Sequence, residues 1–272
     1  MNKKYTFYVE ITTACNLKCP FCPSSNLNNH RYMSFDNYKK IIDSIKDYAN
    51  LVYFHVLGEP SLHKDLSLML DYCENLKIPF AITTNGINLN KLSNFIFNYN
   101  YLKKINISLQ ALIQLNENQR NEYIQNLISF IDKRNNLNSI IPLNLRLWND
   151  KNSLDVIILN SHVKNKLNII VDNNKNIVVQ EADEFIWPSL EHEVNKYQSS
   201  CLGGKKQFAI LNDGRVVLCC LDYLGSTSLG NLFVDDFTTI LNSKLYCDIM
   251  KAFNNRKPYF ELCQKCTFRN RF

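Results

Sequence analysis

The sequence contains no long apolar segment, no internal repeat and no low-complexity tract. None of its apolar runs reaches the ~20 residues that a membrane-spanning helix requires. Residues 1–10 contain two lysines but lack the apolar segment of a secretion signal. We therefore expect a cytoplasmic protein that is not embedded in a membrane.

The overall composition is that of an ordinary globular protein, with 46% hydrophobic and 21% charged residues among 272. This length suffices for one α/β domain with a small appended domain. The chain also has ten cysteines. Because cytoplasmic thiols are kept reduced, so many cysteines indicate metal or iron–sulfur ligands rather than disulfide bonds.

Strand-like and helix-like segments alternate along the first 150 residues. Apolar residues at helical spacing indicate helices between the strands, the first of them capped by Ser34. The predicted strands span 5–11, 51–57, 80–84, 104–110 and 143–148, with two weaker candidates at 167–171 and 177–180. This alternation predicts parallel βαβ units in a barrel or a doubly wound sheet.

Polar residues occupy one face of the fourth and fifth predicted strands. Asn106, Ser108 and Gln110 alternate with apolar residues, and so do Asn144 and Arg146. A parallel sheet that is covered by helices on both faces is apolar on both faces. The polar face therefore predicts a lumen that holds a polar ligand, and it favours a partial (βα)6 TIM-like barrel over a closed one.

Three cysteines follow the first predicted strand as Cys15-x3-Cys19-x2-Cys22, with Phe21 before the third. Three thiolates this close can hold one four-iron cluster and leave the fourth iron open to a further ligand. A structural zinc site with His30 as a fourth ligand is the alternative. The position at the end of a barrel strand, where active sites of barrel enzymes lie, favours the cluster.

The chain changes character from Cys201 onward. Two short strands joined through Asn212-Asp213-Gly214 predict a hairpin, and a helix is expected over 236–253. Four further cysteines, with Cys220 in reserve, are candidate ligands: Cys201, Cys219, Cys263 and Cys266. We place the domain boundary between residues 1–190 and 191–272. A zinc ribbon is again the alternative.

Taken together, the motifs resemble those of the radical S-adenosylmethionine (SAM) superfamily over most of residues 5–150. The matching residues are Cys15, Cys19, Cys22 and Phe21, with Gly58-Glu59-Pro60 after the second strand. Leu57 stands where the family often has a further glycine. The resemblance implies a [4Fe-4S] cluster whose open iron binds the amino and carboxylate groups of SAM.

The same resemblance implies further contacts to SAM. Phe21 matches the aromatic residue near the adenine, and Gly58, Glu59 and Pro60 match the segment that receives the amino group. The other candidates are Asn85 in the turn after the third strand and, on the polar strand faces, Ser108, Gln110 and Arg146. The guanidinium of Arg146 suits a carboxylate. These polar side chains can equally satisfy one another in a core. His55 shares its strand parity with Glu59, which allows it to face the lumen, but it is interpreted as a satisfied core histidine.

The C-terminal cysteines resemble a shortened, twitch-type SPASM domain, which carries an auxiliary iron–sulfur cluster. The resemblance implies one auxiliary [4Fe-4S] cluster held by Cys201, Cys219, Cys263 and Cys266. Four protein ligands leave no open iron, so electron transfer is its expected role. Cys73 and Cys247 are predicted to lie in the core as small apolar residues.

The implied activity is reductive cleavage of SAM to a 5′-deoxyadenosyl radical that takes hydrogen from a substrate, giving a net oxidation or C–H modification. An electron donor such as flavodoxin or ferredoxin is implied. The substrate stays open between a small molecule, a peptide and a tRNA or rRNA nucleotide. The formal charge of +6 falls to roughly +3 with both clusters bound, which weakens the case for RNA. A zinc-binding interaction protein is the non-enzymatic alternative.

Overall fold

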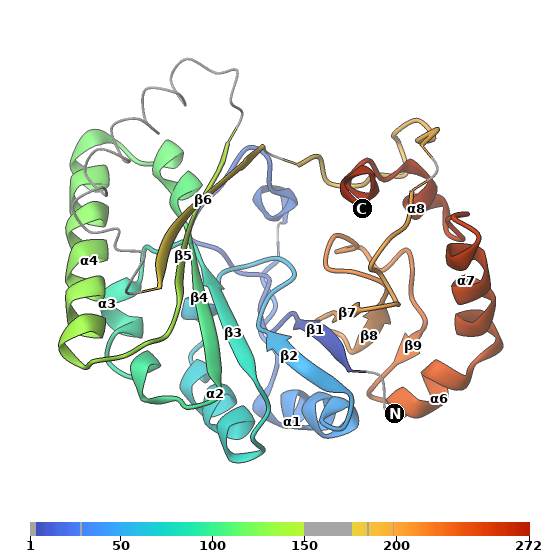
Figure 1. Ribbon diagram of the computed structural model, residues 1–272, viewed down its shortest axis with the longest axis horizontal. Coiled ribbons are helices and arrows are strands. Elements are labelled where there is room, and N and C mark those ends of the chain that lie inside the picture. Colours follow the sequence, from blue (N-terminus) through green and yellow to red (C-terminus); the bar gives the residue numbers. More distant parts are fainter. Residues whose placement is uncertain (1–3, 28, 150–175, 184, 198) are drawn as a thin grey trace.

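The protein is described by a computed structural model over residues 4–27, 29–149, 176–183, 185–197 and 199–272. Its strands form one sheet in the order β6-β5-β4-β3-β2-β1-β7-β8-β9 (Figure 1). The strands span β1 Tyr5–Val9, β2 Ala49–Tyr53, β3 Phe80–Thr84, β4 Leu102–Ser108, β5 Leu143–Asn149, β6 Ile177–Asp183, β7 Gln207–Ile210, β8 Arg215–Val217 and β9 Gly230–Asn231.

Strands β1 to β6 are parallel, and they form the curved wall of an unclosed barrel. The sheet order runs from β6 at one edge to β9 at the other, so the described strands do not close into a ring. The prediction of an α/β partial barrel followed by a hairpin is confirmed. The sheet also continues across the domain boundary that we predict at residue 190. Strand β7 pairs in parallel with β1, and the antiparallel pairs β7–β8 and β8–β9 extend the sheet further.

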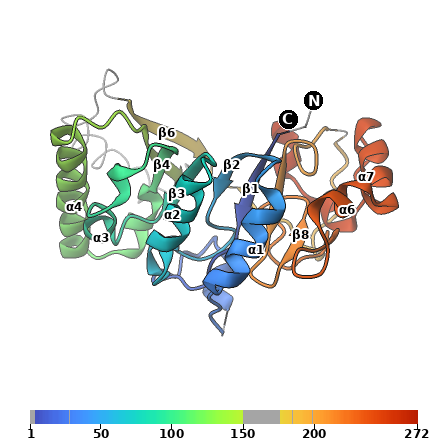
Figure 2. The same ribbon diagram turned by 90° about the horizontal axis from the view of Figure 1, so that it is seen from below.

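Helices α1 to α4 lie on the outer face of the barrel wall, and α6 and α7 flank the hairpin (Figures 1 and 2). The helices span α1 Phe35–Ile45, α2 Leu66–Asn75, α3 Leu89–Leu92, α4 Glu117–Asn136, α6 Phe237–Asn242, α7 Lys244–Asn254 and α8 Glu261–Lys265. Ser34 caps α1 as predicted, since its side chain accepts from the backbone N–H of Asn37. No helix in the described part of the chain is long and apolar enough to cross a membrane.

Aromatic side chains join the barrel to the C-terminal region. Phe7 of β1 and Phe208 of β7 stack with their ring centroids 6.0 Å apart, and Phe237 of α6 meets each of them edge-on at 5.1 and 5.2 Å. All three are fully buried. The hairpin is therefore packed into the same core as the barrel and is held rigidly beside β1.

Several sequence-based boundaries differ from the structure: β1 ends at Val9 instead of residue 11, and β4 spans Leu102–Ser108 instead of 104–110. The helix predicted over 236–253 is split between α6 and α7 at Ser243, which has an extended backbone and accepts a hydrogen bond from Tyr246 N at 3.1 Å. An N-cap of this kind starts a new helix. The second strand ends at Tyr53 instead of residue 57. The candidate strand at 167–171 lies outside the described residues, and that at 177–180 belongs to β6.

Candidate active site

The cysteine triplet lies on a loop that follows β1 and is ordered by its own backbone. Cys22 N donates to Cys19 O at 3.0 Å, and Ser25 Oγ donates to Cys22 O at 2.9 Å. The Cys22 thiol lies 3.0 Å from Ser24 Oγ. These local bonds hold Cys19 and Cys22 close together on one loop.

The Gly58-Glu59-Pro60 turn is fastened directly to the start of this loop. Glu59 N donates to Ala14 O at 2.7 Å. Gly58 has φ +75°, and a Cβ added there would lie 2.3 Å from Thr12 O. Only glycine fits such a position, because the left-handed backbone and the close approach both exclude a side chain.

The Glu59 carboxylate is buried and joins this turn to the turn after β3. It accepts from Ser61 N at 3.0 Å, Thr84 Oγ1 at 2.8 Å and Asn85 N at 2.6 Å. Burial raises its pKa, and the hydrogen bonds oppose that shift. The side chain thus braces the protein, while its proposed role toward the SAM amino group stays a prediction.

Asn85 connects the turn after β3 to the cysteine loop. Its side-chain amide donates to Asn16 Oδ1 at 2.7 Å and lies 3.8 Å from the Cys15 thiol. Burial is the largest cause that raises the pKa of Cys15, and the Glu59 and Cys22 charges add to it. The structure therefore brings Cys15, Glu59 and Asn85 together, as the motif positions predict.

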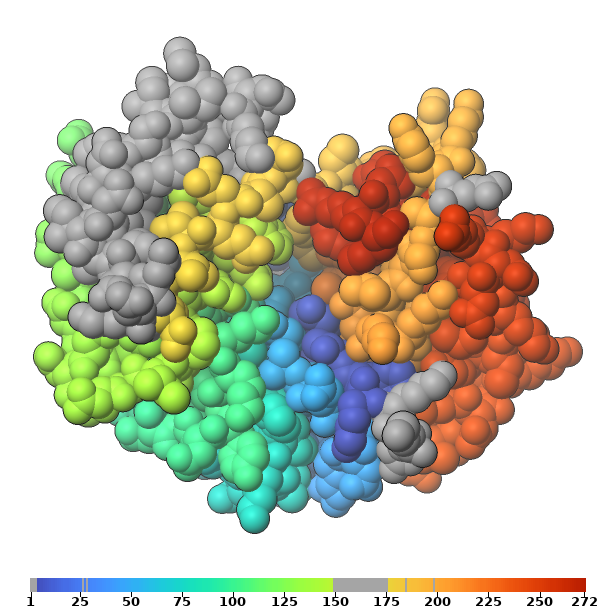
Figure 3. Space-filling model, in the orientation of Figure 1, coloured from blue at the N-terminus to red at the C-terminus, as the bar shows by residue number. Residues whose placement is uncertain are grey.

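A cavity of about 400 Å³ opens inside the barrel, between the parallel strands and the C-terminal region. The molecular surface is hollowed between β6, in yellow, and the C-terminal residues, in red (Figure 3). Phe21 and Cys22 line the cavity. So do Ser108 at the end of β4 and Arg146 of β5, which confirms that the polar strand faces look into a lumen. Gln110 also lines the cavity, but from the 3-10 helix Leu109–Gln114 instead of the predicted strand.

The polar strand faces divide into two layers with different hydrogen bonding. In the lower layer, Asn106 donates to Thr83 Oγ1 at 3.0 Å and accepts from Asn144 Nδ2 at 3.1 Å. In the upper layer, Gln110 Oε1 and Arg146 Nε are buried without a hydrogen-bond partner among the described residues. Buried polar atoms are rarely left unpaired. The lower layer is structural, whereas the upper layer is available to a ligand.

The cavity has a second polar wall, of which the sequence pointed to His55 alone, through its parity with Glu59. Tyr8 and Tyr53 stack in parallel with their ring centroids 4.9 Å apart, and each meets His55 edge-on at 5.6 Å. His55 Nδ1 is buried without a described partner, so the interpretation of a satisfied core histidine is wrong. The alternation of β1, which places Tyr8 opposite Phe7 and Val9, is the signal that could have found this wall.

All four predicted auxiliary cysteines line a second cavity of about 40 Å³ beside the first. Burial raises the pKa of each thiol, namely Cys201, Cys219, Cys263 and Cys266. The charge of Cys201 raises the pKa of Cys219, Cys263 and Cys266 further. Thiols so close together and so buried are poor acids unless a positive centre binds them.

Arg269 supplies a positive charge to this group. Its side chain is 4% exposed and donates to the backbone carbonyls of Tyr197 and Asn195, the latter at 2.6 Å. Its charge lowers the pKa of Cys201, although burial outweighs it. A buried guanidinium that no described carboxylate contacts fits a group of thiolates carrying negative charge. These residues therefore fit an anionic iron–sulfur cluster.

The three remaining cysteines, Cys73, Cys220 and Cys247, lie in different environments. Cys220 lines the larger cavity and lies next to Cys219. Cys73 is buried as predicted, and its thiol lies 3.0 Å from the Tyr38 hydroxyl. Cys247 is exposed on α7, which contradicts its predicted core position. Among the described residues, no three histidine, cysteine or acidic side chains are grouped as a single metal ion requires.

Two family models match the chain. The radical SAM superfamily model matches residues 9–136, and the iron–sulfur cluster-binding SPASM domain matches residues 201–267. The chain therefore belongs to the radical SAM superfamily and carries a C-terminal SPASM-type domain. This membership implies SAM, a [4Fe-4S] cluster and auxiliary iron–sulfur binding, as the cysteine motifs predict.

Relatives of known name are similar over a part of the chain. A probable GTP 3′,8-cyclase of Methanococcus maripaludis is 34% identical over 110 residues, which are 39% of this chain and 37% of the relative. An S-adenosylmethionine-dependent nucleotide dehydratase of Selenomonas ruminantium is 29% identical over 83 residues, 30% of either chain. The chain thus matches less than two fifths of the length of these relatives.

Solved structures resemble the whole fold. BtrN in complex with AdoMet and 2-DOIA superposes with a TM-score of 0.67 at 16% identity, covering 98% of this chain and 94% of that one. The enzyme anSMEcpe with bound AdoMet and the Cp18Cys peptide superposes with a TM-score of 0.61 at 14% identity, covering 97% and 86%. At sequence identities this low, the superpositions show a similarity of fold alone.

Proposed function

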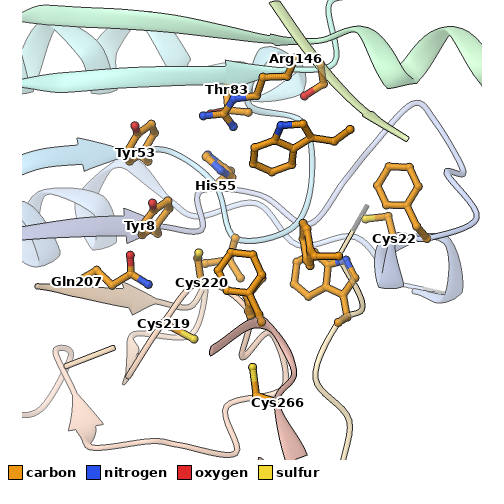
Figure 4. A pocket seen from close by; sticks show the side chains of 18 of the residues that line it. Tyr8, Cys22, Tyr53, His55, Thr83, Arg146, Gln207, Cys219, Cys220 and Cys266 are labelled. Atoms are coloured by element: carbon orange, nitrogen blue, oxygen red, sulfur yellow. The ribbon is translucent and has the colours of Figure 1, made fainter. Parts of the chain in front are cut away.

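We propose that this protein is a SAM-cleaving oxidoreductase whose substrate binds in the larger cavity. The supporting observation is that one cavity is lined by Cys22 of the triplet and also by Cys201, Cys219 and Cys266 of the auxiliary group (Figure 4). A molecule bound there lies between the two predicted cluster sites. This placement suits a reaction in which one cluster starts the chemistry and the other receives an electron.

When bound, the proposed cofactors would supply the redox chemistry: one electron to SAM would generate a radical able to take a substrate hydrogen atom, and the auxiliary cluster would accept the second electron as the substrate loses a proton. Cys15, Cys19 and Cys22 are the proposed ligands of the SAM-binding cluster. Phe21, Gly58, Glu59, Pro60, Asn85, Ser108, Gln110 and Arg146 are the SAM contacts predicted from the resemblance. Flavodoxin or ferredoxin is the proposed electron donor.

The chain's own residues have three tasks in this scheme. Asn85 and the Glu59 carboxylate fix the cysteine loop against the turns after β2 and β3. Gln110 and Arg146 offer unpaired polar atoms to a ligand in the lumen. The aromatic residues Phe185, Trp187 and Phe268 line the cavity beside the auxiliary cysteines and exclude water from it.

The electron-acceptor role is tested with Cys263→Ala. Loss of one ligand should remove the auxiliary cluster and lower the iron content from about eight to about four atoms per chain. Dithionite-reduced enzyme should still release 5′-deoxyadenosine from SAM, while formation of oxidised product stops. Cys247→Ala, which removes an exposed thiol, is the matched control. Full product formation without the auxiliary cluster would contradict the proposed role.

A further inference from the structure

Arg146 and the cysteine triplet have different surroundings in the larger cavity. Arg146 lies on β5, which β4, β3 and β2 separate in the sheet from β1, the strand before the triplet. Burial lowers the pKa of Arg146, and the groups that oppose this shift are Tyr53, Tyr8 and Cys220. Figure 4 shows Tyr8, Tyr53, His55 and Gln207 on one side of the cavity and Cys22 on the other. Arg146 therefore belongs to the parallel barrel wall, beside Thr83 and apart from Cys22.

The charge of Arg146 is not balanced by the protein that is described. The residues that line the cavity include two arginines, Arg146 and Arg269, and no aspartate or glutamate among the described residues. Arg269 donates to backbone carbonyls and Ser199 Oγ, and it lies among the auxiliary thiols. Arg146 stacks on Trp148, with 4.8 Å from its guanidinium carbon to the ring centroid, and its Nε has no described partner. A guanidinium with a buried Nε–H that has no described partner favours an anionic ligand.

The side chains around Arg146 add unpaired hydrogen-bond donors to the same cavity. The indole N–H groups of Trp148 and Trp187 are both buried without a described partner, and both residues line the cavity. An indole N–H can only donate. Together with Arg146 Nε, these groups suit the acceptor oxygens of an anion. His55 is neutral at physiological pH, because burial and the Arg146 charge lower its pKa to about 3.

The size and lining of the cavity limit what the anion is attached to. A volume of about 400 Å³ lies within the range of roughly 300–1,000 Å³ that small-molecule sites have. Aromatic contacts link the wall of the barrel to the C-terminal region: Phe185 lies 6.2 Å from Trp148 and 5.4 Å from both Trp187 and Phe268 between ring centroids. These rings border the site with apolar surface, so it favours a compact molecule over a folded RNA.

We infer, on the basis of the proposed function, that the substrate is a small molecule with a carboxylate or phosphate group, which pairs with Arg146 while its carbon skeleton packs on Tyr8 and Tyr53. The anion then lies beside β5, apart from Cys22. This assigns Arg146 to the substrate instead of the SAM carboxylate, which the resemblance implies. The carbon skeleton of the substrate extends towards Cys22, where the hydrogen atom is removed.

The test uses the holoenzyme with both clusters, dithionite and saturating SAM, and measures release of 5′-deoxyadenosine. The probes are three fractions of a deproteinised, ultrafiltered extract of the source cells: compounds retained on an anion exchanger, on a cation exchanger and on neither. The anion-retained fraction should stimulate release, and the other two should not. Stimulation by another fraction, by added peptide or RNA, or none by the anion-retained fraction, would overturn the inference.

Arg146→Gln should raise the amount of the active fraction needed for half-maximal stimulation about 100-fold, the cost of removing one partner of a buried charge pair. Arg146→Lys should recover part of the loss. Lys104→Gln is the matched control, since Lys104 lies 5.6 Å from the Tyr53 ring but does not line the cavity. An equal rise in the KM for SAM would assign Arg146 to SAM and overturn the inference. Absence of 5′-deoxyadenosine in every wild-type reaction would instead overturn the proposed function.

Discussion

The two cysteine groups of this protein are assembled in opposite ways. Cys15, Cys19 and Cys22 lie on one short loop, which hydrogen bonds fix to the turns after β2 and β3. The auxiliary cysteines come from three separate segments: the stretch before β7, the residues after β8 and the region of α8. The first group is a local motif, whereas the second exists only when the C-terminal region is folded.

The charges beside the two groups differ as well. The triplet has the Glu59 carboxylate as a neighbour, whereas the auxiliary group has the Arg269 guanidinium in addition to the Asp222 carboxylate. Three thiolates on a four-iron core carry a net charge of about −1, and four carry about −2. The more highly charged cluster site is thus the one that the protein supplies with a buried cation. A cluster stabilised in this way accepts an electron more readily, which agrees with the proposed electron-acceptor role.

The largest expected effect is the loss of one cluster while the other is retained. Cys19→Ala should remove the triplet cluster, lower the iron content from about eight to about four atoms per chain and stop 5′-deoxyadenosine formation. The auxiliary cluster should persist, because its ligands lie on other segments. Iron analysis and electron paramagnetic resonance of the reduced protein measure both outcomes. Loss of all iron would show that the two sites depend on each other and would contradict their separate assembly.

The same difference explains what could be predicted from the sequence. The triplet and the Gly58-Glu59-Pro60 turn are recognisable because their spacing is local, and the polar alternation on β4 and β5 correctly predicts a lumen. The alternation of β1 indicates the face of Tyr8, but the stacking of Tyr8 on Tyr53 beside His55 was missed because it depends on the pairing of β1 with β2. Local propensity also could not show that Ser243 divides one helix into two. Features set by the register of distant strands carry no short-range signal.

A second prediction tests the attachment of the cysteine loop to the barrel. Gly58→Ala forces a left-handed backbone onto alanine, at a cost of about 1–2 kcal/mol, and drives Cβ against Thr12 O. We expect 5′-deoxyadenosine formation to fall at least about tenfold, with the triplet cluster depleted and the auxiliary cluster retained. Gly225→Ala is the control, since its φ of +82° is similar but its Cβ meets the flexible Arg215 side chain. Equal depletion of both clusters in Gly58→Ala would contradict local anchoring.

A third prediction concerns Glu10, which joins the two regions. Its carboxylate accepts from Leu57 N and Asn212 N, both at 3.2 Å. Burial raises its pKa to about 7, above the value of about 4.5 for the unfolded chain. The folded state therefore favours the protonated acid, and the free energy of unfolding should fall by about 1.4 kcal/mol between pH 6 and pH 8. Anaerobic urea unfolding at several pH values measures this change in the free energy of unfolding. Glu10→Gln should remove the part of the change that Glu10 causes. An unchanged slope in Glu10→Gln would show that another group titrates.

The most narrowly confined effect concerns Arg269, because we expect it to change the auxiliary cluster alone. A unit charge several ångströms away at an effective dielectric constant of about 20 is worth about 2–4 kcal/mol, which corresponds to roughly 100 mV for one electron. Arg269→Gln should therefore lower the reduction potential of the auxiliary cluster by that order and leave the triplet cluster unchanged. Arg269→Lys keeps the charge but loses the forked hydrogen bonds to Tyr197 and Asn195. Spectroelectrochemical titration should show a smaller shift for lysine. Equal shifts in both variants would mean that Arg269 acts through packing, and the contrast in charge between the two sites would then have no electrostatic consequence.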